Sequence, residues 1–448
     1  MAFSSIEFIF MFLPLFLAIF YLAPARLKPY CLLLGSLVFY WLSVKNIAAF
    51  LLPLVGILMA YLSGLAHHKQ RKSAGLVSKL CLIVLFALLL GFKYVGLFTE
   101  TPVIVPAGMS FYIFQLTAYI FDVRRQKYAA ETNLLKLSNG MLMFPKLLSG
   151  PITPYDNLRY HLLNFSFSFD KFDDGLRTFI IGLGMKVLIA DRVGGLWTQI
   201  KAMGFDGIST AFAWLGILAY SLQLYFDFCG YSVMAIGVGK MLGIELPKNF
   251  NHPYISRSMS EFWRRWHITL GKWFREYIYI PLGGNRLGKG RQTFNLLVVW
   301  LFTGIWHGST LNFLIWGLFL FVLISLEKVL KIDKNRSPIS HLYMIPAILV
   351  SWAFFAIPNT GDLFIFLGKL FPFFGTSEAV FPTDYLYYGK QYIVYLIVGI
   401  IASTPLFDKP WKAIRNTHIG TFILFIIFWL SVFCLSVGMN DPFMYFNF

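Results

Sequence analysis

Two histidines stand in apolar stretches of this chain, where a titratable ring needs a partner. His307 lies in residues 301–310, LFTGIWHGST, and His267 lies in residues 260–277, SEFWRRWHITLGKWFREY. Burying an imidazole without a hydrogen-bond partner costs roughly 1–3 kcal/mol, and its pKa near neutrality suits it to proton transfer. Each ring is therefore either a hydrogen-bonded core residue or a candidate catalytic group.

The composition shows what surrounds these rings. Of the 448 residues, 58% are hydrophobic and only 13% are charged, and the mean hydropathy is +0.67. A soluble domain carries about 25% charged residues. Apolar runs approach the roughly 20 residues that cross a bilayer core, so we predict an all-α, polytopic membrane protein with about nine to eleven transmembrane helices. Runs of this kind are residues 6–22, 76–92, 211–224, 311–326 and 421–437.

The formal charge of +17 does not indicate nucleic-acid binding. Lysines and arginines fall in short loops between apolar runs, as the positive-inside rule predicts for cytoplasmic loops. Their alternation predicts an N-terminus outside the cytoplasm and an extracytoplasmic aromatic tail, residues 439–448. Because no long polar linker or internal repeat divides the chain, residues 1–448 are expected to fold as one membrane domain. The four scattered cysteines form no CxxC pair and suggest neither a disulfide framework nor a metal site.

Irregular elements are expected in the middle of the chain. Residues 144–154 contain three prolines and a glycine, which predicts a re-entrant segment sheltered by protein. Residues 260–277 place aromatic side chains on one helical face and charges on the other, which predicts an interfacial amphipathic helix. A helix over residues 293–306 would be roughly 21 Å long, too short to cross the bilayer. His307 is therefore expected within membrane depth, where an ionisable residue is by default a functional candidate.

Residues 250–286 and 303–309 together resemble one enzyme family. The segments are FNHPYISRSMSEFWRRWHITLGKWFREYIYIPLGGNR and TGIWHGS, with support from residues 109–122, 144–152 and 225–237. They resemble the membrane-bound O-acyltransferases, in the bacterial branch that includes the membrane subunit of alginate O-acetylation. The chain departs from that pattern at Cys229 and Val233, where relatives carry serine and aspartate.

The resemblance implies an acyl relay across the bacterial inner (cytoplasmic) membrane. It implies a cytoplasmic thioester donor, acetyl-CoA or an acyl carrier protein, and no permanently bound cofactor or metal. The acceptor would be a hydroxyl of an exported polysaccharide or cell-envelope glycan, reached with an extracytoplasmic acyltransferase partner. The helices would surround a central tunnel that joins the donor side to the acceptor side.

Individual residues receive roles from this resemblance. His307 would be the base, while His267 would either orient the thioester carbonyl or brace the tunnel wall. Tyr445 would carry the acyl group onward, or the tail would only anchor in the membrane interface. Arg264 and Arg265 could attract donor phosphates or simply follow the positive-inside rule. The residues expected to bind the donor or line the tunnel are Trp266, Arg264, Arg265, Trp306, Asp227 and Tyr231.

Two other functions remain open from the sequence. One is D-alanyl transfer toward teichoic acid, which uses the same family of enzymes with separate small subunits. The other is a polysaccharide or lipid transporter whose histidines gate protons. If the purified protein neither hydrolyses labelled acetyl-CoA nor transfers its acyl group, while His307→Ala still abolishes export, the protein is a transporter.

Overall fold

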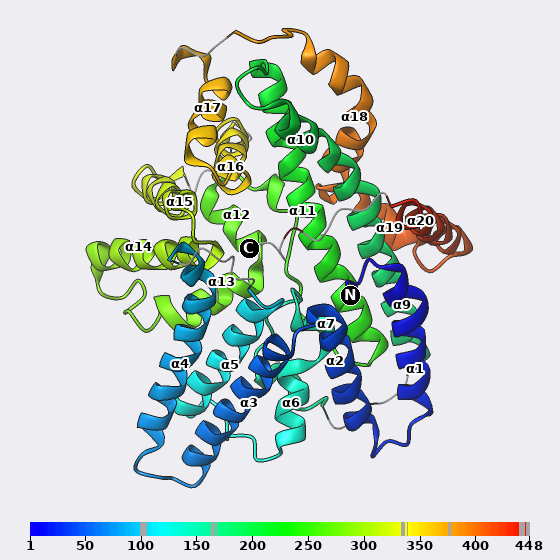
Figure 1. Ribbon diagram of the computed structural model, residues 1–448, viewed down its shortest axis with the longest axis vertical. Helices are drawn as coiled ribbons and strands as arrows, with labels where there is room; N and C mark the ends of the chain where they lie inside the picture. Colours follow the sequence, from blue (N-terminus) through cyan, green and yellow to red (C-terminus); the bar gives the residue numbers. More distant parts are fainter. Residues whose placement is uncertain are drawn as a thin grey trace. The chain divides into compact units, whose positions relative to one another are not determined.

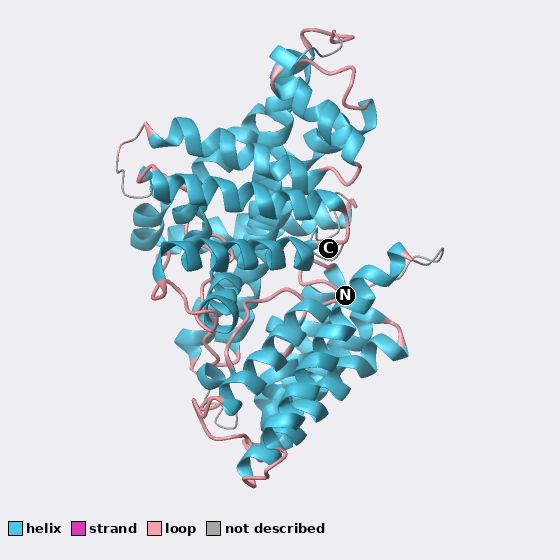
Figure 2. Ribbon diagram, turned by 90° about the vertical axis from the view of Figure 1, so that its left-hand side faces the viewer, coloured by secondary structure: helices cyan, strands magenta, loops and turns pink. Residues whose placement is uncertain are grey.

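The regular structure of this chain is helical wherever it can be described (Figures 1 and 2). The computed structural model describes residues 1–98, 105–162, 165, 168–332, 337, 339–374, 378–438 and 444. Within these ranges the chain separates into two compact units. The all-α, polytopic architecture is confirmed, whereas the expectation of one domain over residues 1–448 stays a prediction.

The first unit comprises Met1–Gly182 and Tyr231–Lys248. Helices α3, α4 and α5 pack against one another in it (Figure 1), and α2 packs against α6 and α7. Rings of Phe3, Phe8, Phe39 and Phe144 form an aromatic centre with centroid distances of 4.7 to 6.4 Å. The helices are η1 (Phe8–Phe12), α1 (Leu13–Leu22), α2 (Lys28–Val44), α3 (Ile47–His68), α4 (Ala74–Tyr94), η2 (Val95–Leu97), α5 (Met109–Arg124), α6 (Leu134–Leu142), α7 (Phe144–Leu147), α8 (Tyr155–Leu158) and most of α9 (Phe169–Gly184).

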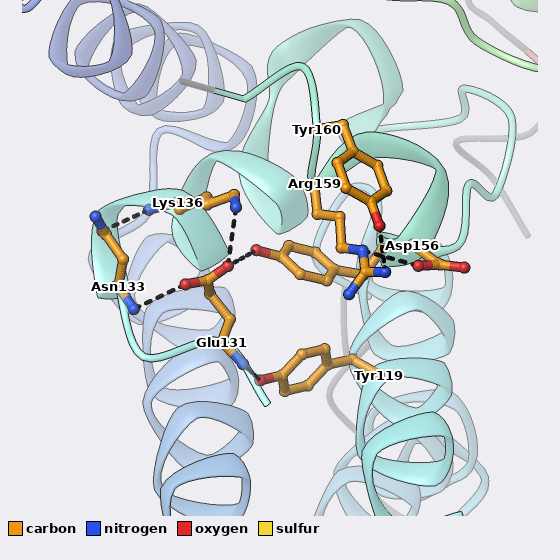
Figure 3. Close-up of polar contacts among 8 residues, drawn as sticks. Tyr119, Glu131, Asn133, Lys136, Asp156, Arg159 and Tyr160 are labelled. Atoms are coloured by element: carbon orange, nitrogen blue, oxygen red, sulfur yellow. Dashed lines mark hydrogen bonds and ion pairs between the residues drawn. The ribbon is translucent and has the colours of Figure 1, made fainter. Parts of the chain in front are cut away.

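A polar network holds the loop between α5 and α6 in this unit (Figure 3). The Glu131 carboxylate accepts hydrogen bonds from the Tyr155 hydroxyl at 2.8 Å and from the Asn133 backbone N–H at 3.0 Å. It also lies 3.3 Å from the Lys136 ammonium. Because the Asn133 side chain accepts from the backbone N–H of Lys136, the same loop caps the start of α6. The network thus ties α6 to the short helix α8.

The second unit comprises Leu183–Gly230 and Asn249–Phe448. Helix α11 is shared, since its residues after Gly230 belong to the first unit. Helices α14, α15 and α16 pack in sequence order. The elements are η3 (Met185–Ala190), α10 (Asp191–Met203), α11 (Thr210–Met241), η4 (Pro253–Ile255), α12 (Met259–Arg265), α13 (Ile268–Phe274), η5 (Arg275–Tyr279), α14 (Gly288–His307), α15 (Leu311–Val329), α16 (Ser340–Ala356), α17 (Thr360–Leu370), η7 (Pro372–Phe374), α18 (Asp384–Ala402), η8 (Pro405–Phe407), α19 (Asp408–Ile414) and α20 (His418–Ser436).

Five described helices are long and apolar enough to cross a membrane, or six if the bent pair Asp384–Ala402 and Pro405–Ile414 is one span. The five are Ile47–His68, Ala74–Leu97, Thr210–Met241, Leu311–Val329 and His418–Ser436. The predicted number, about nine to eleven, is higher because each apolar run of the sequence is long enough to suggest a span. Several of these runs fold into shorter apolar helices, namely Phe8–Leu22, Lys28–Val44 and Ser340–Ala356.

The irregular middle of the chain differs from the sequence expectations in two places. The helix that ends at His307 begins at Gly288 and has 20 residues, about 30 Å in length, so the prediction of a helix too short to cross the bilayer was wrong. Residues 260–277 form no single amphipathic helix, because α12 ends at Arg265 and α13 begins at Ile268. Residues 144–154 do form a broken segment, with only the short helix α7 and with Ser149 and Thr153 buried.

Candidate active site

The break between α12 and α13 positions His267. Ser258 begins α12 by accepting a hydrogen bond from the backbone N–H of Glu261 at 3.0 Å. Trp266 then adopts an extended conformation, and His267 has a φ of 44° in the left-handed region. A non-glycine residue there stores strain and persists only where its surroundings enforce it. The turn therefore holds the His267 side chain at a fixed place instead of on a continuous helical face.

Asn249 provides the restraint at this turn. Its backbone carbonyl accepts from the Ile268 N–H at 2.9 Å, and its side-chain Oδ1 accepts from the Thr269 N–H at 3.2 Å and the Thr269 hydroxyl at 2.9 Å. The same Oδ1 lies 3.1 Å from Nδ1 of His267. Since an amide oxygen only accepts, Nδ1 of His267 donates, and Nε2 of the neutral ring keeps its lone pair.

The His267 ring is almost fully buried, with 2% of its surface exposed. The Phe228 ring of α11 meets it edge-on, with centroids 4.7 Å apart. Burial in these surroundings lowers the pKa of His267 to about 3, because an apolar setting disfavours the charged imidazolium. His267 is therefore neutral at physiological pH and a weak proton acceptor.

His307 is the last residue of α14 and lies in an aromatic cage. Its ring centroid is 5.0 Å from that of Phe355 and 5.1 Å from that of Trp316. A Cβ atom on Gly308 would lie 2.2 Å from the Phe313 ring, so only glycine at this position lets Phe313 pack beside His307. The ring is 4% exposed. The cage fixes the imidazole at the end of its helix.

The approach of α15 to α14 also depends on small residues. A Cβ on Gly304 would lie 2.5 Å from the carbonyl oxygen of Phe313, and one on Gly317 would lie 2.5 Å from that of Trp300. The two helix backbones therefore cross in direct contact, a form of packing that small residues permit in membrane proteins. This crossing sets the position of His307 relative to Phe313 and Trp316.

Both histidines line one cavity of about 580 Å³ within the second unit. A cavity of this size can hold a drug-sized ligand. Three tryptophans form part of its wall: Trp263, Trp266 and Trp300. Four cations also line it: Arg264, Lys272, Arg275 and Lys328. An apolar chamber with a positive lining attracts an anionic ligand and holds its apolar part.

Trp306, Arg264 and Arg265 have different surroundings. Arg264 lines the cavity, whereas Arg265 forms an ion pair with Glu261 at 2.8 Å and donates to the Asn251 carbonyl. The Trp306 ring packs against both histidines, with centroid distances of 6.4 Å to His267 and 4.6 Å to His307. The indole of Trp306 thus contacts the imidazole rings of both histidines. The donor or tunnel roles of these residues stay predictions.

Three predicted site residues lie elsewhere or outside the described residues. Asp227 of α11 forms a buried ion pair with Lys186 at 2.6 Å. Tyr231 stacks on Phe3 in the first unit, with ring centroids 4.8 Å apart. Tyr445 lies outside the described residues, although its sequence neighbour Met444 is described.

Sequence reasoning missed Asn249 and Lys186. Asn249 lies in the polar loop before residues 260–277. Helical periodicity gives no sign that its side chain contacts His267, which lies 18 residues later in the sequence. Lys186 could have been noticed as a lone cation in the apolar run of residues 179–190. Within the described part of the chain, no group of three or more His, Cys, Asp or Glu side chains could hold a metal ion.

Comparison with known proteins finds one family model and several relatives whose names describe the transfer of acyl groups. The model of the membrane-bound O-acyltransferase family matches residues 10–357. The chain is 38% identical to the probable alginate O-acetylase AlgI of Azotobacter vinelandii, with both chains fully covered. It is 33% identical to the peptidoglycan O-acetyltransferase of Helicobacter pylori, over 80% of this chain and 77% of that one. It is also 29% identical to the teichoic acid D-alanyltransferase of Bacillus subtilis, over 59% of this chain and 69% of that one.

The matched region includes both cavity histidines and the helices that carry them, since α12, α13 and α14 lie within residues 10–357. A polytopic helical fold and a buried pair of histidines suit an enzyme that transfers acyl groups in a membrane. This chain belongs to the membrane-bound O-acyltransferase family and is an O-acyltransferase.

Proposed function

We propose that this protein transfers an acetyl group from a cytoplasmic thioester toward hydroxyls of an exported polysaccharide or another cell-envelope glycan. The single observation that carries the proposal is the cavity that His267, His307 and four cations line together. The name of the Azotobacter vinelandii relative, which is covered over its full length, supports acetyl transfer to a polysaccharide. The bacterial inner membrane is the proposed location.

His307 is the proposed general base. A hydroxyl oxygen attacks the thioester carbonyl carbon, the C–S bond breaks, and an ester forms. His307 takes the hydroxyl proton and then gives it to the departing thiolate, so the proton count balances. Burial lowers the pKa of His267 to about 3, so His267 is a poor proton acceptor at neutral pH. Proton transfer is therefore assigned to His307.

His267 is proposed to hold the donor by accepting a hydrogen bond. Its Nδ1–H is used by Asn249, which leaves Nε2 as an acceptor. A neutral ring in this tautomer does not donate to a thioester carbonyl. It can accept from an amide N–H of the donor's pantetheine arm, and the cations at the same cavity suit the donor's phosphates.

Tyr445 is proposed as an intermediate carrier. Its phenol would receive the acetyl group with the help of His307 and pass it to an extracytoplasmic acyltransferase partner. The support is the sequence position of Tyr445 beside Met444, which contacts α11 of the second unit. The tunnel roles predicted for Asp227 and Tyr231 stay predictions.

Reconstituted vesicles test the function. Purified protein receives acetyl-CoA with a labelled acetyl group, an acetylated carrier protein, or a D-alanyl carrier protein, and thiol release and label on the acceptor glycan are measured. We expect thiol release with an acetyl donor and labelled glycan when the partner is present. Release with the D-alanyl donor alone would assign the teichoic acid reaction instead, and no release with any donor would refute the proposal.

A Tyr445→Phe variant tests the carrier step separately. The phenylalanine keeps the aromatic ring and removes only the hydroxyl that would hold the acetyl group. We expect the labelled tail peptide to disappear together with glycan labelling. Undiminished glycan labelling would refute the carrier role and leave the transferase proposal intact.

A further inference from the structure

Glu327 is a buried carboxylate that the proposed transfer chemistry does not use. It is 1% exposed and lies near the end of α15, which ends at Val329. Helix α15 is one of the helices long and apolar enough to cross a membrane. An ionised carboxylate buried there is costly unless hydrogen bonds satisfy its oxygens. The hydrogen-bond partners of Glu327 therefore indicate what the residue does.

Both carboxylate oxygens of Glu327 hold the start of α12. Oε1 accepts a hydrogen bond from the backbone N–H of Met259, which lies 68 residues earlier in the chain. Oε2 accepts from the backbone N–H of Ser260 at 3.0 Å and from the Ser260 hydroxyl at 2.9 Å. The Tyr343 hydroxyl of α16 is a further hydrogen-bond partner of the same carboxylate. One side chain thus joins α12, α15 and α16.

These hydrogen bonds complete the first turn of α12. The first N–H groups of a helix have no acceptor within the helix. In α12 the N–H groups of Met259 and Ser260 donate to Glu327, and that of Glu261 donates to the Ser258 side chain. A helix of seven residues is not stable by itself, and hydrogen bonds to an ionised acceptor are stronger than neutral ones. The position of α12 therefore depends on Glu327.

The anchored helix forms one wall of the cavity. This donor wall consists of Ser260, Trp263 and Arg264, which α12 contributes to the lining. Helix α12 ends just before the turn that presents His267. Lys328, the residue after Glu327, lines the same cavity from α15. The anchor therefore sets the distance between groups of α12 and α15 that face one ligand space.

We infer that Glu327 is a positioning residue that holds the donor wall in place by fastening the start of α12 to α15. Glutamine cannot replace it, because glutamine has one acceptor oxygen and would turn its NH₂ group toward one of the two backbone N–H groups. His307 belongs to α14, so Glu327 acts on the donor side of the cavity and not on the base. The effect on donor binding rests on the proposed function, whereas the anchoring itself does not.

Hydrogen exchange tests the anchoring on the full-length protein in detergent. Glu327→Gln removes the acceptor of at least one backbone N–H at the start of α12. We expect exchange of residues 258–265 to be about tenfold faster in this variant than in the wild type. Glu378→Gln is the matched control, because it removes an exposed carboxylate of the same unit, and it should exchange like the wild type.

The kinetics of thiol release test the effect on the donor. In Glu327→Gln the KM for acetyl-CoA should rise several-fold with little change in kcat, because the donor wall moves while His307 stays on α14. General loss of folded protein would lower the measured kcat and leave KM unchanged. A lower kcat at wild-type KM would therefore contradict the positioning role.

Two further outcomes keep the anchoring separate from the proposed function. Wild-type exchange of residues 258–265 in Glu327→Gln would overturn the inference. If that variant does not fold, Glu327→Asp decides the matter, since aspartate keeps the charge but is one carbon too short to reach α12, and wild-type exchange and KM in it would overturn the inference. Faster exchange in the variants, together with no thiol release from any donor by the wild type, would support the anchoring and refute the proposed function.

Discussion

Asn249 Oδ1 lies 3.1 Å from His267 Nδ1, and this contact decides which ring nitrogen carries the proton. The same oxygen accepts from the backbone N–H and the hydroxyl of Thr269. One amide therefore sets the tautomer of a cavity histidine and stabilises the left-handed turn that presents it.

Replacing Asn249 by alanine should destabilise the protein and reduce acyl transfer. The change leaves three buried donors of His267 and Thr269 without their acceptor, at about 1–3 kcal/mol each. Thermal unfolding in detergent and thiol release from acetyl-CoA measure the two effects. Asn251→Ala is the matched control, because Asn251 is exposed in the same loop and bonds Arg265 through its backbone N–H and carbonyl, which alanine keeps. Equal effects of the two changes would contradict this role of Asn249.

His267 should make the folded protein less stable in acid. Its pKa is about 3 when folded and near 6.5 when unfolded, so below pH 6.5 the unfolded chain takes up a proton that the folded chain refuses. From pH 7.5 to 5.5 this contributes a loss of about 1.4 kcal/mol. Unfolding measured at both pH values should show a smaller loss in His267→Gln than in the wild type. The control His418→Gln, at an exposed position, should follow the wild type.

Gly304→Ala should push α14 away from α15 and impair the site. The new Cβ would lie 2.5 Å from the Phe313 carbonyl oxygen, a backbone atom that cannot move alone. We expect a destabilisation of about 1–3 kcal/mol together with reduced thiol release. Gly290→Ala is the control in the same helix, since its Cβ meets nothing within 4 Å and alanine favours helix there. If both variants behave alike, the close helix crossing does not position His307.

The cavity cations should determine donor affinity more than turnover. Arg275→Gln removes one positive charge from the lining and should raise KM for acetyl-CoA several-fold, with little change in kcat. The difference from the wild type should shrink as salt concentration rises, because salt screens charges at exposed sites. Lys289→Gln, an exposed change outside the lining, is the control. A lower kcat with unchanged KM would contradict a donor-binding role.

The class of fold is predicted correctly, because it depends on local composition. The two histidines that the sequence singles out line one cavity, and their catalytic roles stay predictions. Prediction from the sequence fails where the deciding contact is distant in sequence. Helical periodicity over residues 260–277 gives no sign of the break at His267, which Asn249 stabilises from another loop. The Asp227–Lys186 pair likewise joins two helices far apart in sequence, and no local pattern reveals it.

The placement of His307 depends both on its sequence neighbours and on contacts that are distant in sequence. Its neighbours Trp306 and Gly308 can be identified in the sequence. In the structure the Trp306 ring packs against His307, and Gly308 leaves room for the Phe313 ring. The length of its helix was underestimated because the polar first turns, from Gly288, are not apolar enough to be recognised as part of the span. The cage of Trp316 and Phe355 depends on how α14, α15 and α16 pack, which is a tertiary property.

The most direct test of the account is single-turnover thiol release from acetyl-CoA by His307→Ala in reconstituted vesicles with the glycan acceptor. Removing a general base typically costs about 10²–10⁴-fold in rate, so we predict a loss of at least about 100-fold at unchanged donor binding. His307→Ala should retain the wild-type helix content and elution volume. Thiol release and acceptor labelling within about threefold of the wild type would show that His307 is not the base of this reaction.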